Sequence, residues 1–180
     1  MSNTLNTKMI RDGKIVDNDW LLIATDGEIP PSGKIIVPLA LWLIAKSLSA
    51  HLLNTHQGEV GVWLDGNEDV SVLVGALDSI PLIAIQFPKF ADGRGYSTAA
   101  LLRTRYGFTG ELRAIGDVLR DQLFYMQRVG FNAFVVRADK DIDDAVTALN
   151  DFSETYQAST DQPQPLFRRR VQLQAVIGAA

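Results

Sequence analysis

The sequence contains no cysteine and only two histidines among its 180 residues. Without cysteine the chain can form no disulfide, no thiolate nucleophile, no thiolate-bound zinc site and no iron–sulfur cluster ligated by its own side chains. His51 and His56 have no carboxylate spaced to complete a catalytic triad or a metal site, and we interpret both as surface residues. Any redox role would therefore depend on a partner protein or on a borrowed cofactor, which the sequence does not identify.

Long apolar runs are also missing. The longest, residues 35–45, is too short to span a bilayer and is interrupted by Pro38. The N-terminal residues are polar and carry no apolar signal core, so we expect a cytoplasmic protein without a membrane anchor. We predict one α/β domain over residues 10–158, because 47% apolar content in 180 residues supports one sizeable core. Residues 1–9 and 159–180 are predicted to be flexible or docked on a partner.

The net charge of −4 is unevenly distributed along the chain. Residues 88–138 contain seven arginines and one lysine against four acidic residues, which gives this block +4 and leaves −8 for the rest. A basic block in an acidic protein favours a small anion or an acidic partner. Nucleic acid is not expected, because it usually binds a domain that is basic overall.

Short apolar runs and helical stripes alternate from Lys34 onward, and this alternation predicts the fold class. We expect strands at 34–37, 59–64, 82–87, 111–115 and 133–136, and helices at 39–53, 69–79, 97–106, 118–129 and 141–156. About five strand–helix units predict a mainly parallel sheet with right-handed crossovers, after a short β prelude at 14–16 and 20–24. An open doubly wound sheet and a partial βα barrel both satisfy the pattern, because periodicity does not determine strand order.

The segment 90–97 lies where a buried strand gives way to a helix N-terminus. Two glycines flank Arg94, and a turn with positive φ would expose backbone N–H groups beside its guanidinium, which suits an anion. In the alternative interpretation, Gly93 and Gly95 serve only turn geometry and Ser97 caps the helix. The glycines match a dinucleotide-binding fingerprint only in part, because its third glycine is missing.

Loops that follow parallel strands share one edge of the sheet, where ligands bind in α/β proteins. The expected catalytic residues, a general base and a proton donor, are Asp92, Asp117 and Tyr96. The expected anion-binding residues are Gly93, Arg94, Gly95, Ser97, Arg113 and Arg137. Each also has a structural explanation. The aspartates can cap helices or pair with arginines, Asp117 above all as the cap of helix 118–129, while Tyr96 can pack and Arg137 can lie on the surface.

The central block resembles a bacterial protein family of unknown function. The motifs that carry the resemblance include Phe87-Pro-Lys-Phe-Ala-Asp-Gly-Arg-Gly-Tyr-Ser97 and Gly110-Glu-Leu-Arg-Ala114, and a looser similarity extends over residues 10–167. Members of this family are commonly labelled as oxidoreductases of sulfite reduction. They are encoded beside a sulfite or nitrite reductase-like hemoprotein and a sulfonucleotide reductase. The resemblance supplies no catalytic residues, and Asn132 stands where the family usually has aspartate.

Two functions are compatible with these observations. The first is an auxiliary oxidoreductase of assimilatory sulfite and sulfate reduction that binds an anionic ligand at Asp92–Ser97. The second is a non-catalytic partner or assembly factor that docks on sulfite reductase or the sulfonucleotide reductase. The absence of cysteine weakens any version in which the chain itself carries electrons.

Overall fold

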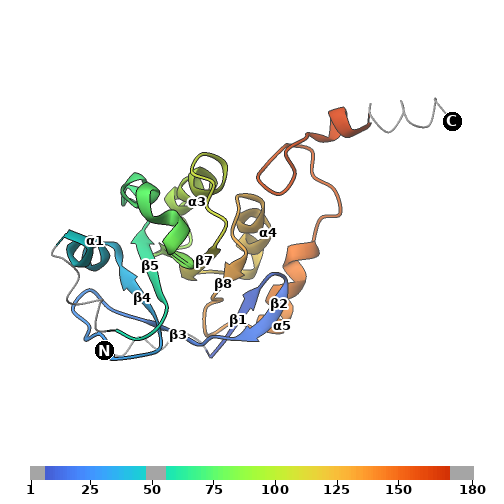
Figure 1. The fold of residues 1–180 in the computed structure, drawn as a ribbon. Helices are drawn as coiled ribbons and strands as arrows, with labels where there is room; N and C mark the ends of the chain where they lie inside the picture. Colours follow the sequence, from blue (N-terminus) through green and yellow to red (C-terminus); the bar gives the residue numbers. More distant parts are fainter. Residues whose placement is uncertain (1–6, 48–55, 171–180) are drawn as a thin grey trace.

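The computed structural model describes residues 7–47 and 56–170, which form a curled sheet with helices packed against it (Figure 1). The strands are β1 (Lys8–Arg11), β2 (Lys14–Asp17), β3 (Trp20–Leu22), β4 (Lys34–Pro38), β5 (Val60–Asp65), β6 (Leu82–Phe87), β7 (Glu111–Gly116) and β8 (Ala133–Phe134). The helices are α1 (Leu39–Ser47), η1 (Val70–Ser79), α3 (Arg94–Thr104), α4 (Arg120–Arg128), α5 (Ile142–Thr147) and η2 (Ala148–Asn150). The predicted α/β class is confirmed, including the β prelude.

The sheet has the strand order β2-β1-β8-β7-β6-β5-β4-β3. Strands β3 to β8 are parallel, and each pairs with its neighbours in the sequence, whereas β1 is antiparallel to both β2 and β8. Right-handed crossovers between successive neighbours place the connecting helices on one face of the sheet. The fold is therefore a partial βα barrel, and the doubly wound alternative is wrong.

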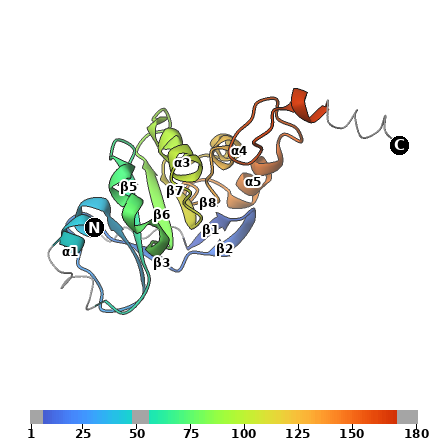
Figure 2. The same ribbon diagram turned by 45° about the horizontal axis from the view of Figure 1, so that its top comes forward.

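Two hydrophobic cores lie on the two faces of this sheet. The larger core consists of outward-facing strand residues and the helix residues that pack on them. Ile85 of β6, for example, belongs to the same cluster as Leu102 of α3 and Leu123 of α4. The smaller one fills the inside of the curl and contains side chains from the strands and from the residue after β8: Met9, Trp20, Ile36, Leu82, Ala84, Ile115, Ala133 and Val135. Figure 2 shows the helices covering the outer face of the strands.

The chain itself draws the two edges of the sheet together. The edge strands β2 and β3 are separated in sequence by only Asn18 and Asp19. Three Cα–Cα steps of 3.8 Å span at most about 11 Å, so the end of β2 lies close to the start of β3. Arg113 of β7 reaches across the interior to the same place, where its Nη1 lies 3.1 Å from Oδ1 of Asn18 and its guanidinium lies 6.0 Å from the Trp20 ring centre. The interior is a packed core.

The segment predicted as a helix over 69–79 is a 3₁₀ helix, η1. Asp69 caps it, with Oδ1 accepting the N–H of Ser71 at 2.9 Å. Side chains three residues apart lie on the same face of a 3₁₀ helix, and the buried residues of η1 follow this period over their first three members. They are Val70, Leu73, Ala76 and Leu77.

Other expectations near the helix ends and the N-terminus need correction. The last predicted helix ends with η2 at Asn150, because none of the residues 151–170 is buried and no apolar face continues the helix. Met9, placed in a frayed N-terminus, belongs to β1 and is 1% exposed. His56 is buried, with its ring nitrogens 2.8 and 2.9 Å from two backbone oxygens, so it is not a surface residue. The predicted helix end at 48–53 and His51 lie outside the described residues.

Within the ranges that the structure describes, no helix combines the length and the apolar character needed to cross a bilayer.

Candidate functional site

The loops after β6, β7 and β8 meet at the C-terminal edge of the parallel strands. The backbone of Phe90 connects them, because its N–H donates to Oδ2 of Asp117 at 2.9 Å and its carbonyl accepts from Nε2 of Gln122 at 3.2 Å. Asp117 in turn accepts from Nη1 of Arg137 at 2.8 Å. We name this group of loops the C-terminal edge, in which two of the predicted site residues, Asp117 and Arg137, are in direct contact.

Asp92 and Arg94 form a closed pair at the start of α3. Nε and Nη2 of Arg94 donate to the two carboxylate oxygens of Asp92 at 2.9 and 2.5 Å, and the backbone N–H of Arg94 donates to Oδ1 at 3.2 Å. The Arg94 hydrogen bonds hold the pKa of Asp92 at about 2, far below its usual value. The carboxylate therefore occupies the position at the helix N-terminus where a bound anion was expected.

Arg137 is engaged in the same way by two carboxylates. Its Nε and Nη2 donate to Asp139 at 2.6 and 3.0 Å, while Nη1 donates to Asp117. The Asp139 hydrogen bonds, followed by that of Asp117, raise the pKa of Arg137, and the pKa of Asp139 falls to about 2 because of Arg137. Two carboxylates therefore already balance this guanidinium.

Asp117 is not a helix cap. Helix α4 begins at Arg120, its N-cap is Leu119, and Oε1 of Gln122 accepts the N–H of Leu119 at 3.0 Å. Asp117 is still tied to the sheet, because its N–H donates to the carbonyl of Phe87 at 2.7 Å. Its carboxylate instead joins the Phe90 loop to Arg137, which makes it a connector of the C-terminal edge.

The two glycines of this segment do not form the turn that was expected. Gly93 has φ −87°, and Gly95 lies inside α3 and does not have positive φ. A Cβ on Gly95 would lie 2.7 Å from Cζ of Phe87 and 2.9 Å from Cγ2 of Ile85, so a glycine is needed for α3 to pack on β6. Ser97 is an exposed residue inside α3 and not its cap.

Tyr96 packs against α4 and β6. Its half-buried ring lies 5.4 Å from the ring of Phe87 and 5.5 Å from that of Tyr125. Burial is the largest cause of its raised pKa, followed by the charge of Asp121, while a hydrogen bond with Gln122 lowers it. A tyrosine with a raised pKa that packs between two helices has a structural explanation.

Arg113 lies in the interior of the curled sheet, apart from the C-terminal edge. Its side chain is fully buried, and Nε donates to Oε1 of Glu111 at 2.6 Å. Burial lowers its pKa, which the charge of Glu111 opposes. Its contacts with Asn18 and Trp20 give it a role in joining the two edges of the sheet.

Three residues outside the predicted list contribute to the C-terminal edge. Gln122 accepts from Leu119 and donates to Phe90, and Asp139 neutralises Arg137. The pKa of Arg94 is raised mainly by its hydrogen bonds with Asp92, to which the charge of Asp65 at the end of β5 adds. The spacing of Asp139 two residues after Arg137, like that of Asp92 two residues before Arg94, was a readable signal for a local ion pair. Nothing in the sequence indicated the contacts of Gln122.

A second region combines exposed aromatic side chains with a cavity. Residues 151–170, the C-terminal arm, leave the body near α4 and α5 and project away from the sheet in both Figure 1 and Figure 2. A cavity of about 350 Å³ lies between α4 and this arm and is lined by Tyr125 and Phe152, among others. We name as the aromatic surface four side chains that are between 54% and 70% exposed: Tyr125, Phe152, Tyr156 and Phe167.

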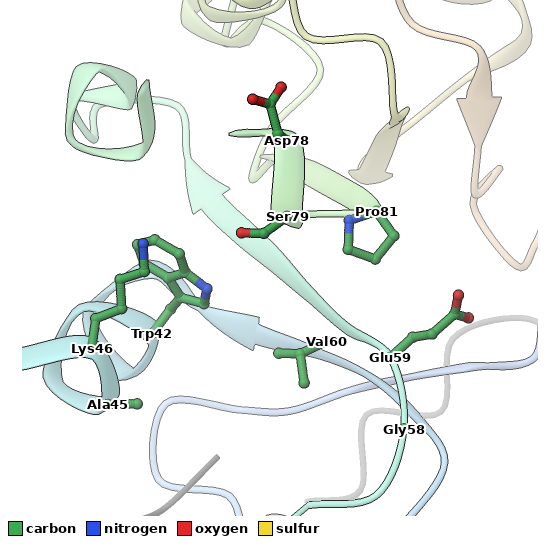
Figure 3. A pocket seen from close by; sticks show the side chains of 9 residues that line it. All are labelled: Trp42, Ala45, Lys46, Gly58, Glu59, Val60, Asp78, Ser79 and Pro81. Atoms are coloured by element: carbon green, nitrogen blue, oxygen red, sulfur yellow. The ribbon is translucent and has the colours of Figure 1, made fainter. Parts of the chain in front are cut away.

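A larger cavity of about 580 Å³ lies between α1 and η1, at the N-terminal ends of β5 and β6 (Figure 3). Trp42 forms one of its walls, and Lys46 lies over the Trp42 ring at 4.6 Å. The carboxylates of Glu59 and Asp78 point in different directions and do not converge (Figure 3). This cavity lies at the end of the strands opposite to the C-terminal edge.

In chemical terms, the C-terminal edge is a network of ion pairs that satisfy one another. Among the residues that the structure describes, no group of three or more histidine and acidic side chains is arranged to hold a metal ion. Arg94 and Arg137 each carry a bidentate carboxylate partner, so an incoming anion would compete with an internal one. The geometry therefore favours a fixed loop structure over an open anion site.

The model of one protein family, described as a bacterial protein of unknown function (DUF934), matches residues 61–167. The match covers the C-terminal edge, α4 and most of the C-terminal arm. No curated protein and no solved structure matches the chain.

Proposed function

The chain belongs to the DUF934 family of bacterial proteins of unknown function, and from that premise we propose that it is a non-catalytic partner of a sulfite-reducing enzyme in the cytoplasm. The resemblance of the central block supports the link to sulfite reduction. The enzymes it would dock on are the sulfite reductase hemoprotein or the sulfonucleotide reductase.

One observation carries the choice of a partner over an enzyme. The carboxylate of Asp92 accepts the backbone N–H at the start of α3 and occupies the Nε–Nη2 edge of the Arg94 guanidinium, two groups that a substrate anion would need. Arg137 is held in the same manner by Asp139 and Asp117. The chain also has no cysteine with which to carry electrons or bind an iron–sulfur cluster itself.

The second candidate function is an auxiliary oxidoreductase that binds an anion at Asp92–Ser97. Its support is the convergence of Asp92, Asp117 and Arg137 on the edge where α/β proteins bind ligands. For an anion to take the Nε–Nη2 edge of Arg94, Asp92 would have to release it. The partner role needs no such rearrangement.

The amount of protein required separates the two functions. We would prepare an extract from a strain that lacks this chain and measure its rate of sulfite reduction as purified chain is added back. If the chain is a partner, the rate rises until the concentration of added chain equals that of the hemoprotein. Further chain then leaves the rate unchanged. A rate that keeps rising in proportion to added chain would show that the chain is itself a catalyst, and no rise would exclude a role in sulfite reduction.

A further inference from the structure

The C-terminal arm is an ordered segment without a core of its own. None of its residues is buried, yet it is fixed to the C-terminal end of α4 through Arg128, whose guanidinium donates to the carbonyl of Gln157. The hydroxyls of Ser159 and Thr160 donate to the carbonyl of Arg128, each at 2.6 Å. Polar contacts therefore fix the arm in place while its aromatic side chains stay in solvent.

The chain segments that carry the four side chains of the aromatic surface are linked by one path of contacts. Phe152 packs on Phe124 of α4 at 4.9 Å between ring centres and lines the same cavity as Tyr125. Thr155, which also lines that cavity, accepts a hydrogen bond from Arg169 through its carbonyl. The backbone N–H of Leu166 donates to the carbonyl of Tyr156 at 3.1 Å. This hydrogen bond brings the backbone next to Phe167 close to that of Tyr156. The path runs from the cavity to the tip of the arm.

The tip of the arm is positively charged. Arg169 pairs with Glu154 at 2.9 Å, whereas Arg168 and Arg170 form no ion pair within residues 7–47 and 56–170. Exposed tyrosine, phenylalanine and arginine are the side chains that dominate binding energy at protein interfaces. In a chain of net charge −4, this local positive charge selects a surface that carries carboxylates.

We propose that the aromatic surface is the docking site for the partner enzyme. Its occupant is a folded protein surface with an apolar hollow rimmed by carboxylates, which accepts the aromatic side chains while pairing with Arg168 and Arg170. A second copy of this chain is the alternative occupant, because two arms exchanged reciprocally would close a two-fold contact. The sedimentation measurement below separates the two occupants. This assignment rests on the proposed function, since it names the surface through which the partner role is carried out.

The experiment measures affinity by calorimetric titration with two purified probes, the sulfite reductase hemoprotein and the sulfonucleotide reductase of the same organism. A triple variant, Tyr125→Ala with Phe152→Ala and Tyr156→Ala, is expected to lose at least about 100-fold in affinity for the enzyme that binds. The double variant Arg168→Glu with Arg170→Glu is expected to lose about tenfold and to show a weaker dependence on salt. These side chains are exposed, so circular dichroism should show the wild-type fold.

The control is a double variant at exposed apolar positions elsewhere, Leu21→Ala with Val72→Ala, each of which is 47% exposed in the wild type. It should bind like the wild type. If the wild type binds a probe and the triple variant binds equally well, the partner role stands but this surface is wrong. If the wild type binds neither enzyme, the proposed function fails as well. Sedimentation that shows a wild-type dimer abolished in the triple variant would assign the surface to a second copy and overturn the proposal.

Discussion

The chain contains two pairs in which an arginine follows a carboxylate by two residues, Asp92–Arg94 and Glu111–Arg113. In the first, the Arg94 side chain is 53% exposed and its partner lies in a loop at the C-terminal edge. In the second, Arg113 is fully buried, and both residues lie on the inner face of β7. Alternation along the strand explains this, because residues two apart point to the same side.

The difference shows that burial, and not sequence spacing, decides what such a pair does. Arg113 joins β7 to Asn18 and Trp20 and thereby closes the curl of the sheet. Arg94 fixes Asp92 over a helix N-terminus. Each arginine already has a carboxylate partner, and for this reason we propose that the aromatic surface, and not the C-terminal edge, carries the function.

Removing the buried arginine should have the largest effect. Among the residues that the structure describes, Arg113→Ala leaves the Glu111 carboxylate, whose side chain is 13% exposed, with Arg11 at 3.6 Å as its remaining ion-pair partner. We expect the free energy of unfolding to fall by about 3–5 kcal/mol in urea titrations, because a buried charge loses its partner. The double variant Glu111→Gln with Arg113→Met removes both charges and should recover most of this loss. A loss below about 1 kcal/mol for Arg113→Ala would contradict its role in closing the sheet.

Gly95→Ala tests the packing that positions the exposed pair. The added methyl would lie 2.7 Å from Cζ of Phe87, so α3 must shift away from β6. We expect a loss of about 1–3 kcal/mol in the free energy of unfolding, which is typical of an overpacked core. Gly93→Ala is the matched control, because a Cβ there meets no atom within 4 Å. Equal stability of the two variants would show that Gly95 is not a packing position.

Acid should weaken the C-terminal edge over a defined range. The pKa values of Asp92 and Asp139 are about 2 in the folded protein, below the ordinary value of 3.8. A carboxylate whose pKa is lower in the folded than in the unfolded protein stabilises the fold at any pH above its unfolded-state pKa. This stabilisation is lost as the pH falls from about 4 to about 2. Unfolding measured across this range should be less pH-dependent in the Asp92→Asn, Asp139→Asn variant. An unchanged pH dependence in this variant would show that these ion pairs do not contribute to the acid sensitivity of the fold.

Arg94→Ala should have the smallest effect on stability, because exposed ion pairs contribute little. We expect melting curves that overlap those of the wild type, and equal thermal shifts of both proteins with sulfate, phosphate and sulfite. A wild-type shift with sulfite that Arg94→Ala abolishes would show that the anion displaces Asp92, and would support the oxidoreductase instead.

The sequence predicted the parallel strands well because their apolar runs are short and bounded by turn residues, as in Leu82–Phe87. Strand order was not predictable, because it depends on which neighbours pair and not on periodicity. The sequence also could not separate Arg113 from Arg94, since both lie near glycines and acids and only the curl of the sheet buries one. The packing role of Gly95 depends on Phe87 and Ile85, contacts that no local pattern records.

We propose that the aromatic surface, and not the C-terminal edge, carries the function, and variants of each region can be compared in the cell. The most direct measurement is the growth rate on sulfite as sole sulfur source of a deletion strain that expresses one of two variants at equal protein level. If the aromatic surface carries the function, it follows that the edge variant, Asp92→Asn with Arg94→Ala, restores wild-type growth. It also follows that the surface variant, Tyr125→Ala with Phe152→Ala and Tyr156→Ala, grows as slowly as the deletion strain, while all strains grow equally on cysteine. Slow growth of the edge variant together with full growth of the surface variant would contradict the proposal.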